Sequence, residues 1–130
     1  MLWDARTGLD TMTLRGHESS CNHAAYNRSG DRIASVDSVG VVNLWEVRTG
    51  SLLCSYDGGP ESANKCAFDP SGQVLAVGTA GSAVKLLDAG TLELISSLDG
   101  NHGVVETVKF EPTGKYVVSG LLDGTVQLWQ

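Results

Sequence analysis

The residues best suited to nucleophilic chemistry are a histidine, a serine and an aspartate: His17, Ser35 and Asp37. A hydrolytic serine needs an exposed hydroxyl, an adjacent base and an oxyanion hole. Ser35 instead occupies a position that recurs at Ser119, as expected of a residue with a repeated structural role. These residues therefore favour a structural role, and the sequence predicts no catalytic residue and no enzyme activity.

The cysteines and a short glycine pair do not form a binding motif. Cys21, Cys54 and Cys66 contain no CxxC pair, and the three histidines do not supply closely spaced metal ligands. Gly78 and Gly81 lack the spacing of a phosphate-binding loop, and they lie between two expected strands rather than before a helix. We predict no metal site, no cofactor and no small-molecule substrate.

Charge and hydropathy restrict the classes of partner. The formal net charge is −6 with nine basic residues, which are scattered singly along the chain. Nucleic-acid binding needs Lys and Arg concentrated on one face, so we expect no nucleic-acid partner. No apolar run approaches the ~18 residues of a membrane span, and Asp4 and Arg6 interrupt any N-terminal signal core. We expect a soluble, intracellular protein with no membrane partner.

The elements that must position these residues are repeated. Several landmarks recur with a constant step of 42 residues and without slippage. The recurring positions are Trp3, Trp45, Leu87 and Trp129; Gly16, Gly58 and Gly100; Gly30, Gly72 and Gly114; and Tyr26, Phe68 and Phe110. Independent series with one spacing indicate a chain built from copies of one structural unit.

Each unit has the pattern of short strands joined by tight turns. Runs that end on an aromatic residue are followed by turns with glycine late and, in two cases, proline early, as tight turns favour. The expected strands are 21–26, 65–68 and 105–110; 33–36, 74–77 and 116–119; 41–47, 84–87 and 125–129; and 51–56 and 92–98. Four short antiparallel strands in a period of ~40–45 residues predict an all-β fold of propeller type.

At these residues the sequence resembles the WD-repeat (WD40) family over essentially its whole length. Gly16 with His17 looks like the GH dipeptide of that family, and Trp3 with Asp4 matches its WD dipeptide. The resemblance implies a partial β-propeller of about three four-stranded blades over residues 1–130, as the C-terminal part of a seven-bladed ring. We place the repeats at about 4–45, 46–87 and 88–129, with residues 1–3 ending a preceding repeat. We expect a truncated N-terminus and a natural C-terminus.

The resemblance also implies a buried network of His, Ser or Thr, Asp and Trp in each repeat. The first repeat has His17, Ser35 and Trp45 but carries Val39 at the aspartate position, and the third has Ser119, Asp123 and Trp129. Asn101 stands at the histidine position of the third repeat, where His102 serves if the loop shifts by one. The middle repeat carries Gly59, Val77, Gly81 and Leu87 at these positions. We therefore expect its packing to depend on Val77, Val84, Leu86 and Leu87.

In such propellers the partners are other proteins, which dock on the rim that carries the loops before the first strand and between the second and third. This rim is weakly acidic and partly apolar here, which suits a protein partner. The expected rim residues are Glu18, Ser20, Ser38, Pro60, Ser62, Ala80, His102, Val104 and Leu122.

Departures from the generic repeat resemble the C-terminal propeller of the sperm-associated antigen sixteen family. They include the absence of a DG turn between Ile33 and Trp45, and Gly59 with Pro60 in place of GH. The segment 84–87 also replaces the second WD. The resemblance implies a scaffold in the cytoplasm and cytoskeleton, on the central-pair microtubules of the axoneme in motile cilia and flagella. A generic cytosolic adaptor, either a ubiquitin-ligase substrate receptor or a signalling scaffold, is the alternative.

Overall fold

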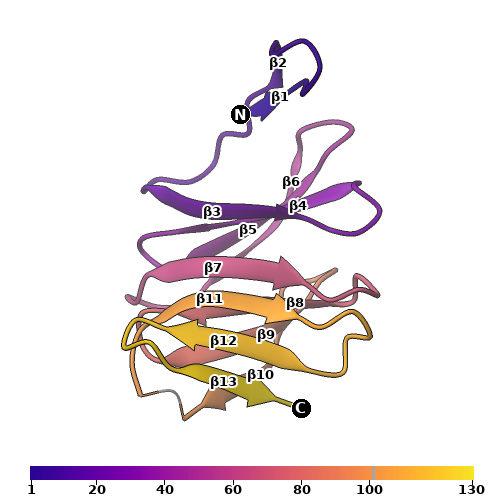
Figure 1. Cartoon of the computed structure of the whole chain (residues 1–130). Coiled ribbons are helices and arrows are strands. Elements are labelled where there is room, and N and C mark those ends of the chain that lie inside the picture. Colours follow the sequence, from indigo (N-terminus) through magenta and orange to yellow (C-terminus); the bar gives the residue numbers. More distant parts are fainter. Residues whose placement is uncertain (101) are drawn as a thin grey trace.

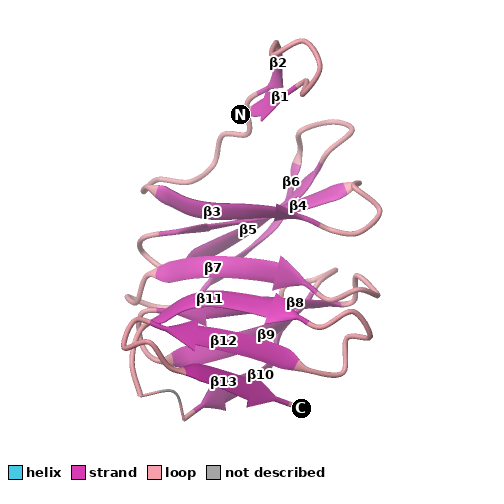
Figure 2. Ribbon diagram, viewed as in Figure 1, coloured by secondary structure: helices cyan, strands magenta, loops and turns pink. Residues whose placement is uncertain are grey.

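The computed structural model describes residues 1–100 and 102–130, and the described chain consists of strands and turns (Figure 2). The strands are β1 (Leu2–Trp3), β2 (Asp10–Met12), β3 (Cys21–Tyr26), β4 (Arg32–Asp37), β5 (Val41–Glu46), β6 (Leu52–Asp57), β7 (Ala63–Phe68), β8 (Val74–Thr79), β9 (Ala83–Asp88), β10 (Leu94–Asp99), β11 (Val105–Phe110), β12 (Val117–Leu121) and β13 (Val126–Trp129). Within the described residues, no helix is long and apolar enough to cross a membrane.

The strands form separate antiparallel sheets that stack on one another (Figure 1). We call β3–β6 the first blade, β7–β10 the middle blade and β11–β13 the third blade; β1 and β2 form a short N-terminal hairpin. The innermost strands β3, β7 and β11 lie side by side along the stack. This is the predicted all-β partial propeller, except that the third blade has three strands in the described chain.

The 42-residue period reappears as one backbone plan in each blade. The pairing between the first two strands has an irregularity at its start in all three blades, at Cys21/His23, Ala63/Lys65 and Val105/Thr107. A tight turn then follows each inner strand and ends on a glycine with φ near +75°, at Gly30, Gly72 and Gly114. A left-handed residue is required there, and glycine adopts it without a Cβ clash. The periodic glycines of the sequence are therefore turn residues.

The sequence repeats and the blades are out of step. The first sequence repeat, 4–45, contains β2 of the N-terminal hairpin and β3–β5 of the first blade. The last strands of the first and middle blades, β6 and β10, are thus supplied by the start of the following sequence repeat. This offset links neighbouring blades covalently through every repeat.

Two apolar clusters hold the blades together, and the middle blade contributes to both. Leu75, Val77 and Leu87 face the first blade, where they pack with Val36, Leu44 and others. Ala76 and Val84 face the third blade, where they pack with Val105 and Val108. The alternation follows from the two-residue period of a strand, which sends successive side chains to opposite faces. Burial of a large apolar side chain contributes about 1.5–3 kcal/mol, so these clusters dominate the packing.

Candidate interaction rim and buried polar network

The polar network of the first blade centres on the hydroxyl of Ser35. Trp45 Nε1–H donates to Ser35 Oγ at 2.8 Å, and His17 Nε2 lies 2.6 Å from the same oxygen. His17 Nδ1 lies 2.8 Å from Asp37 Oδ2. Because the carboxylate accepts from Nδ1–H, Nε2 is left to accept the Ser35 hydroxyl proton. The chain of bonds fixes the indole of Trp45, which is 2% exposed, against the loop that contains Gly16.

The carboxylate of this network comes from Asp37 rather than from the position of Val39. Asp37 is buried at the end of β4, and its Oδ1 accepts the N–H groups of Val39 at 3.1 Å and Val41 at 2.9 Å. Burial raises the pKa of Asp37, but the N–H of Val41, the His17 ring and the N–H of Val39 outweigh it and lower the pKa overall. The expected gap at Val39 is thus filled two residues earlier, which position counting alone missed.

The same geometry decides against a nucleophilic role for Ser35. Its side chain is 5% exposed and its oxygen is bonded by both Trp45 and His17. Removal of one partner would leave a buried polar group unpaired, at a cost of about 1–3 kcal/mol. The arrangement holds a tryptophan and a turn in place, and it offers no exposed hydroxyl for attack on a substrate.

The third blade contains part of the expected network. Trp129 Nε1–H donates to the buried Ser119 Oγ at 3.1 Å, as in the first blade. Asp123 is exposed, and the bonds described for it come from the N–H and hydroxyl of Thr125, at 2.9 and 2.7 Å. Asp123 thus closes the β12–β13 turn, and no described bond joins it to Ser119 or Trp129. Asn101 lies outside the described residues, and His102 is exposed.

The middle blade has two polar ties that the sequence analysis did not identify. Thr79, at the repeat position of Asp37, closes its turn by bonding Ala83 O at 3.0 Å and the Ala83 N–H at 3.3 Å. Lys85 Nζ donates to Gly58 O at 2.8 Å and lies 5.7 Å from the centre of the Tyr56 ring. Lys85 stands 42 residues after the buried Asn43, so alignment of the repeats draws attention to both positions.

The apolar packing of the middle blade matches the expectation for most of its residues. Val77, Val84 and Leu87 are buried in the two clusters, and Leu86 is half-buried beside the second. Gly59 and Gly81 lie in its loops. The blade therefore lacks the tryptophan network but has a full apolar core and its own turn closure.

The residues predicted for the rim meet in pairs at the end of the blades where β3, β7 and β11 begin (Figure 1). In each blade, a backbone N–H of the turn between the second and third strands donates to a carbonyl just before the first strand. These bonds are Ser38 N to Ser20 O at 3.0 Å, Ala80 N to Ser62 O at 2.9 Å and Leu122 N to Val104 O at 2.9 Å. The loops are thereby held as a set, with Glu18, Ser20, Pro60, His102 and Leu122 exposed.

Two asparagines link neighbouring blades beside this rim. Asn22 Nδ2 donates to Ala63 O at 2.9 Å and to Ser62 Oγ at 3.0 Å. Asn64, one repeat later, donates in the same way to Val105 O at 3.0 Å. The asparagines are a further series with the 42-residue step, and that spacing is the signal by which sequence reasoning could have found them.

The cysteines do not gather into a metal site. Among the described residues, no group of at least three His, Cys, Asp or Glu side chains is placed to hold a metal ion. Cys66 is buried between the first and middle blades, and burial raises the pKa of its thiol to about 12. Burial also raises the pKa of the Cys54 thiol. Cys66 behaves as a small core residue.

Comparison with known proteins identifies the repeat unit. The family model described as "WD domain, G-beta repeat" matches residues 8–46 and 92–130, and it leaves out most of the divergent middle repeat. Among curated proteins, none matches the chain. The crystal structure of RRP9 WD40 repeats is similar, with a TM-score of 0.86 and 21% sequence identity over 89% of this chain and 37% of that chain. This chain thus spans well under half of that structure, and at this identity the likeness concerns the fold. The chain belongs to the WD40-repeat family.

Proposed function

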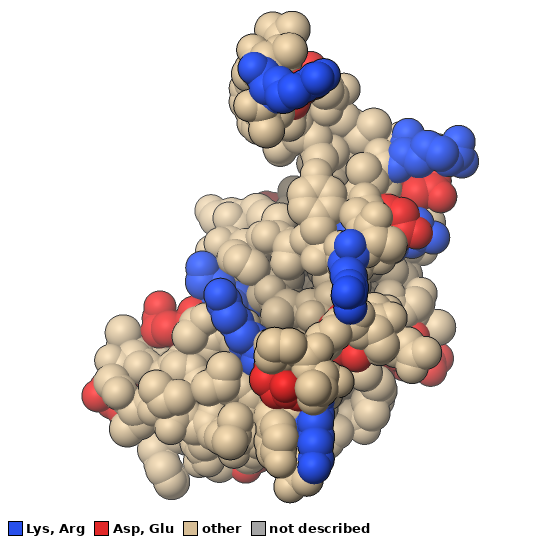
Figure 3. Space-filling view, turned by 45° about the vertical axis from the view of Figure 1, so that its right-hand side comes forward, with Lys and Arg blue, Asp and Glu red and all other residues tan. Residues whose placement is uncertain are grey.

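We propose that this chain is part of a non-catalytic scaffold that binds other proteins through the rim. The proposal is supported by the pairing of the rim loops. In each of the three blades, a backbone hydrogen bond at the same repeat position joins the two loops. A preorganised surface binds with a smaller entropy cost than a set of free loops. Basic and acidic side chains are interspersed on the face shown in Figure 3, and a net charge of −6 suits a protein partner better than a nucleic acid.

The test compares rim variants with a matched variant elsewhere. Proteins captured by the chain are quantified by mass spectrometry for the wild type, for Leu122→Asp and for Leu94→Asp. Both leucines are exposed, at 68% and 51%, but Leu94 lies on β10, at the outer edge of the middle blade. Partners lost with Leu122→Asp and retained with Leu94→Asp support the rim. Equal loss with both variants, or turnover of any substrate in an activity screen, overturns the proposal.

A more specific role is proposed in the central apparatus of motile cilia and flagella, with axonemal central-pair components as partners. Its support is the combination of departures from the generic repeat, including Gly59 with Pro60 and the segment 84–87. An immunoblot of detergent-extracted flagella beside cytosol tests it, with an antibody to residues 41–56. Retention with the axoneme supports the role, and depletion should impair beating before viability. Recovery in cytosol alone with normal beating overturns it and favours a cytosolic adaptor.

A further inference from the structure

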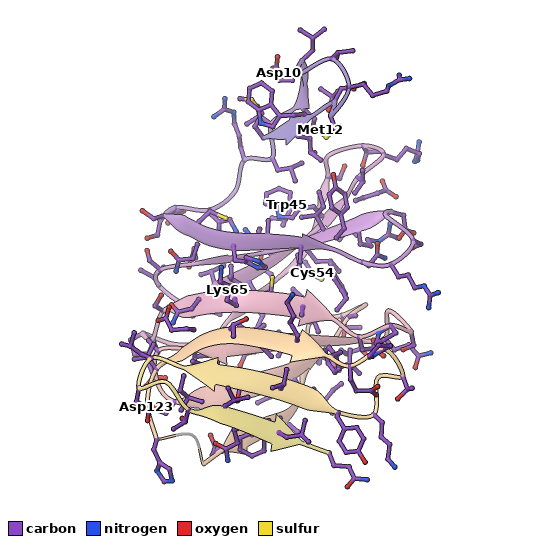
Figure 4. All side chains as sticks on the ribbon, viewed as in Figure 1. Asp10, Met12, Trp45, Cys54, Lys65 and Asp123 are labelled. Atoms are coloured by element: carbon purple, nitrogen blue, oxygen red, sulfur yellow. The ribbon has the colours of Figure 1, made fainter. Side chains whose placement is uncertain are left out.

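A groove runs along the inner strands of the three blades. It has a volume of about 440 Å³ and is bounded by β3, β7 and β11, the strands that lie side by side in Figure 1. Three repeat positions contribute a residue from each blade to its wall, so corresponding residues form rows, one of which is the aromatic series Tyr26, Phe68 and Phe110. The other two rows are His23, Lys65 and Thr107, and Ala25, Ala67 and Lys109. Figure 4 shows Lys65 on β7, between β3 and β11.

The groove is positive within an acidic chain. Its lining contains two lysines and a histidine but no aspartate or glutamate. In the described part of the chain, neither Lys65 nor Lys109 has a carboxylate within 4.0 Å, although acidic residues outnumber basic ones by fifteen to nine. His23 is already engaged, because its Nδ1 accepts the Cys66 N–H at 3.3 Å. Among the residues that line the groove, the two ammonium groups therefore have no carboxylate partner.

The groove continues into an aromatic hollow at the end of the inner strands. Tyr26, Phe68 and Phe110, the aromatic series of the sequence, line both the groove and this second hollow. The carboxyl groups beside them belong to turns: Asp69 accepts the N–H groups of Gln73 and Val74, and Glu111 accepts that of Lys115. The groove thus attracts negative charge, and the adjoining hollow presents aromatic rings beside the Arg28 guanidinium and two carboxylates that are bonded within turns.

We propose that this groove binds an extended acidic peptide segment of a partner protein. Aspartate or glutamate side chains of the peptide pair with Lys65 and Lys109, and an apolar side chain packs on Tyr26, Phe68 and Phe110. A nucleic acid fits less well, because it requires many more cations than two. The site rests on the proposed function only in that its ligand is a protein, and it is separate from the rim.

Fluorescence anisotropy with a defined probe tests the site. The probe is a fluorescein-labelled peptide with a run of glutamates followed by leucines, and its matched control peptide has glutamines in place of the glutamates. The variants are Lys65→Gln with Lys109→Gln, and, as a control of equal charge change, Lys115→Gln with Arg48→Gln. Lys115 and Arg48 are exposed and outside the groove. Thermal unfolding of each variant checks that it is folded.

Loss of two solvent-accessible ion pairs should make the groove variant bind the acidic peptide roughly fivefold more weakly than the wild type, which corresponds to about 1 kcal/mol. The control variant should bind like the wild type, and added salt should weaken binding. Equal loss in both variants, equal binding of the glutamine peptide, or no binding of the acidic peptide overturns the site. Lysine-dependent binding of a single-stranded oligonucleotide in preference to the peptide also overturns it. Leu122→Asp should leave peptide binding unchanged, so failure of the rim and failure of the groove are distinguishable.

Discussion

The first and middle blades have the same backbone plan but are held by different side chains. In the first blade, Trp45 fills the space at the end of the third strand, and a chain of hydrogen bonds through Ser35 fixes it. In the middle blade the equivalent residues are Leu87 and Val77, both buried in the apolar cluster with the first blade. The comparison teaches that the fold requires filled volume and bonded turns rather than one particular network.

The first and middle blades also differ in the residues that adopt a left-handed backbone conformation. Gly40 and Gly50 have positive φ in the first blade, and the middle blade carries Ser82 and Leu92 at these positions with φ of 70° and 62°. Side chains other than glycine are strained in this region. Leu92 is 2% exposed in the apolar cluster, so its burial offsets the strain. Ser82 has no such burial, which leaves one turn of the middle blade less favourable than its counterpart.

The largest expected effect tests the apolar core of the middle blade. Leu87→Ala removes a fully buried side chain and leaves a cavity, so the free energy of unfolding should fall by about 3 kcal/mol. Urea unfolding measures this change. Leu94→Ala, at an exposed position of the same blade, should change stability by less than about 0.5 kcal/mol. Similar values for the two variants would show that the middle blade does not depend on this core.

The next effect tests the network of the first blade. Ser35→Ala leaves the indole N–H of Trp45 and a nitrogen of His17 without a partner, which should cost about 2 kcal/mol in urea unfolding. Asp37→Asn supplies a useful comparison, because it keeps an oxygen for the turn N–H groups but weakens the bond from His17. A neutral Ser35→Ala would mean that the first blade, like the middle one, is held by packing alone.

A smaller loss is expected when the polar tie of the middle blade is removed. Lys85→Met keeps an apolar stem but removes the bond to Gly58 O and the cation near the Tyr56 ring, so stability should fall by about 1 kcal/mol. The control is Lys115→Met, since Lys115 lies over the Tyr116 ring and has no described bond to a carbonyl. Equal effects of the two changes in thermal and urea unfolding would show that the contacts of Lys85 do not stabilise the middle blade.

A gain in stability is expected when glycine replaces the serine that has a positive φ in the middle blade. Ser82→Gly relieves the left-handed conformation and should raise the free energy of unfolding by about 0.5–1 kcal/mol. The reciprocal change, Gly40→Ser, should be destabilising, because a Cβ there would meet the carbonyl oxygens of Gly59 and Glu61 at 2.5 Å. A loss of stability with Ser82→Gly would show that the serine side chain makes a compensating contribution.

The smallest expected effect is a pH-dependent loss of stability where the first blade contacts the middle blade. Partial burial and the neighbouring Lys65 ammonium lower the pKa of His23, and its Nδ1 accepts the Cys66 N–H. A histidine with a lowered pKa in the folded state contributes stability above its unfolded pKa of about 6.5 and loses it as pH falls through the folded value. The loss should be about 0.5 kcal/mol, the worth of one hydrogen bond.

The difference in unfolding free energy between the wild type and His23→Asn isolates this titration from those of other groups. The asparagine oxygen can accept the same N–H but does not titrate near neutral pH. The wild type should therefore lose stability relative to the variant between pH 7 and pH 5. A difference that stays constant over this range would show that protonation of His23 does not affect the stability of the protein.

The extent of prediction from sequence differs between the fold and the candidate site. The step from Trp3 to Trp45 and Trp129, with the repeated glycine turns, predicted the strands and the propeller, because these positions impose backbone geometry in every repeat. The rim loops were placed at one end for the same reason, whereas which rim residues contact a partner is not determined by period. Asp37 was missed because counting from Asp123 assumes that each turn takes its carboxylate from one position.

By itself the sequence determined the blade plan, since a two-residue strand period and a 42-residue repeat are local properties of the chain. Only the tertiary structure decided which contacts different side chains make in blades that share one backbone plan. Lys85 bonds Gly58, and Asn22 bonds Ala63, although the partners are far apart in sequence, because stacking of the sheets brings them close in space. It also brought Lys65 and Lys109 together on one inner wall, where lysines scattered singly in the sequence become a shared positive surface. The physical reason is that hydrogen bonds and charge interactions depend on distance in space, which packing sets and periodicity does not.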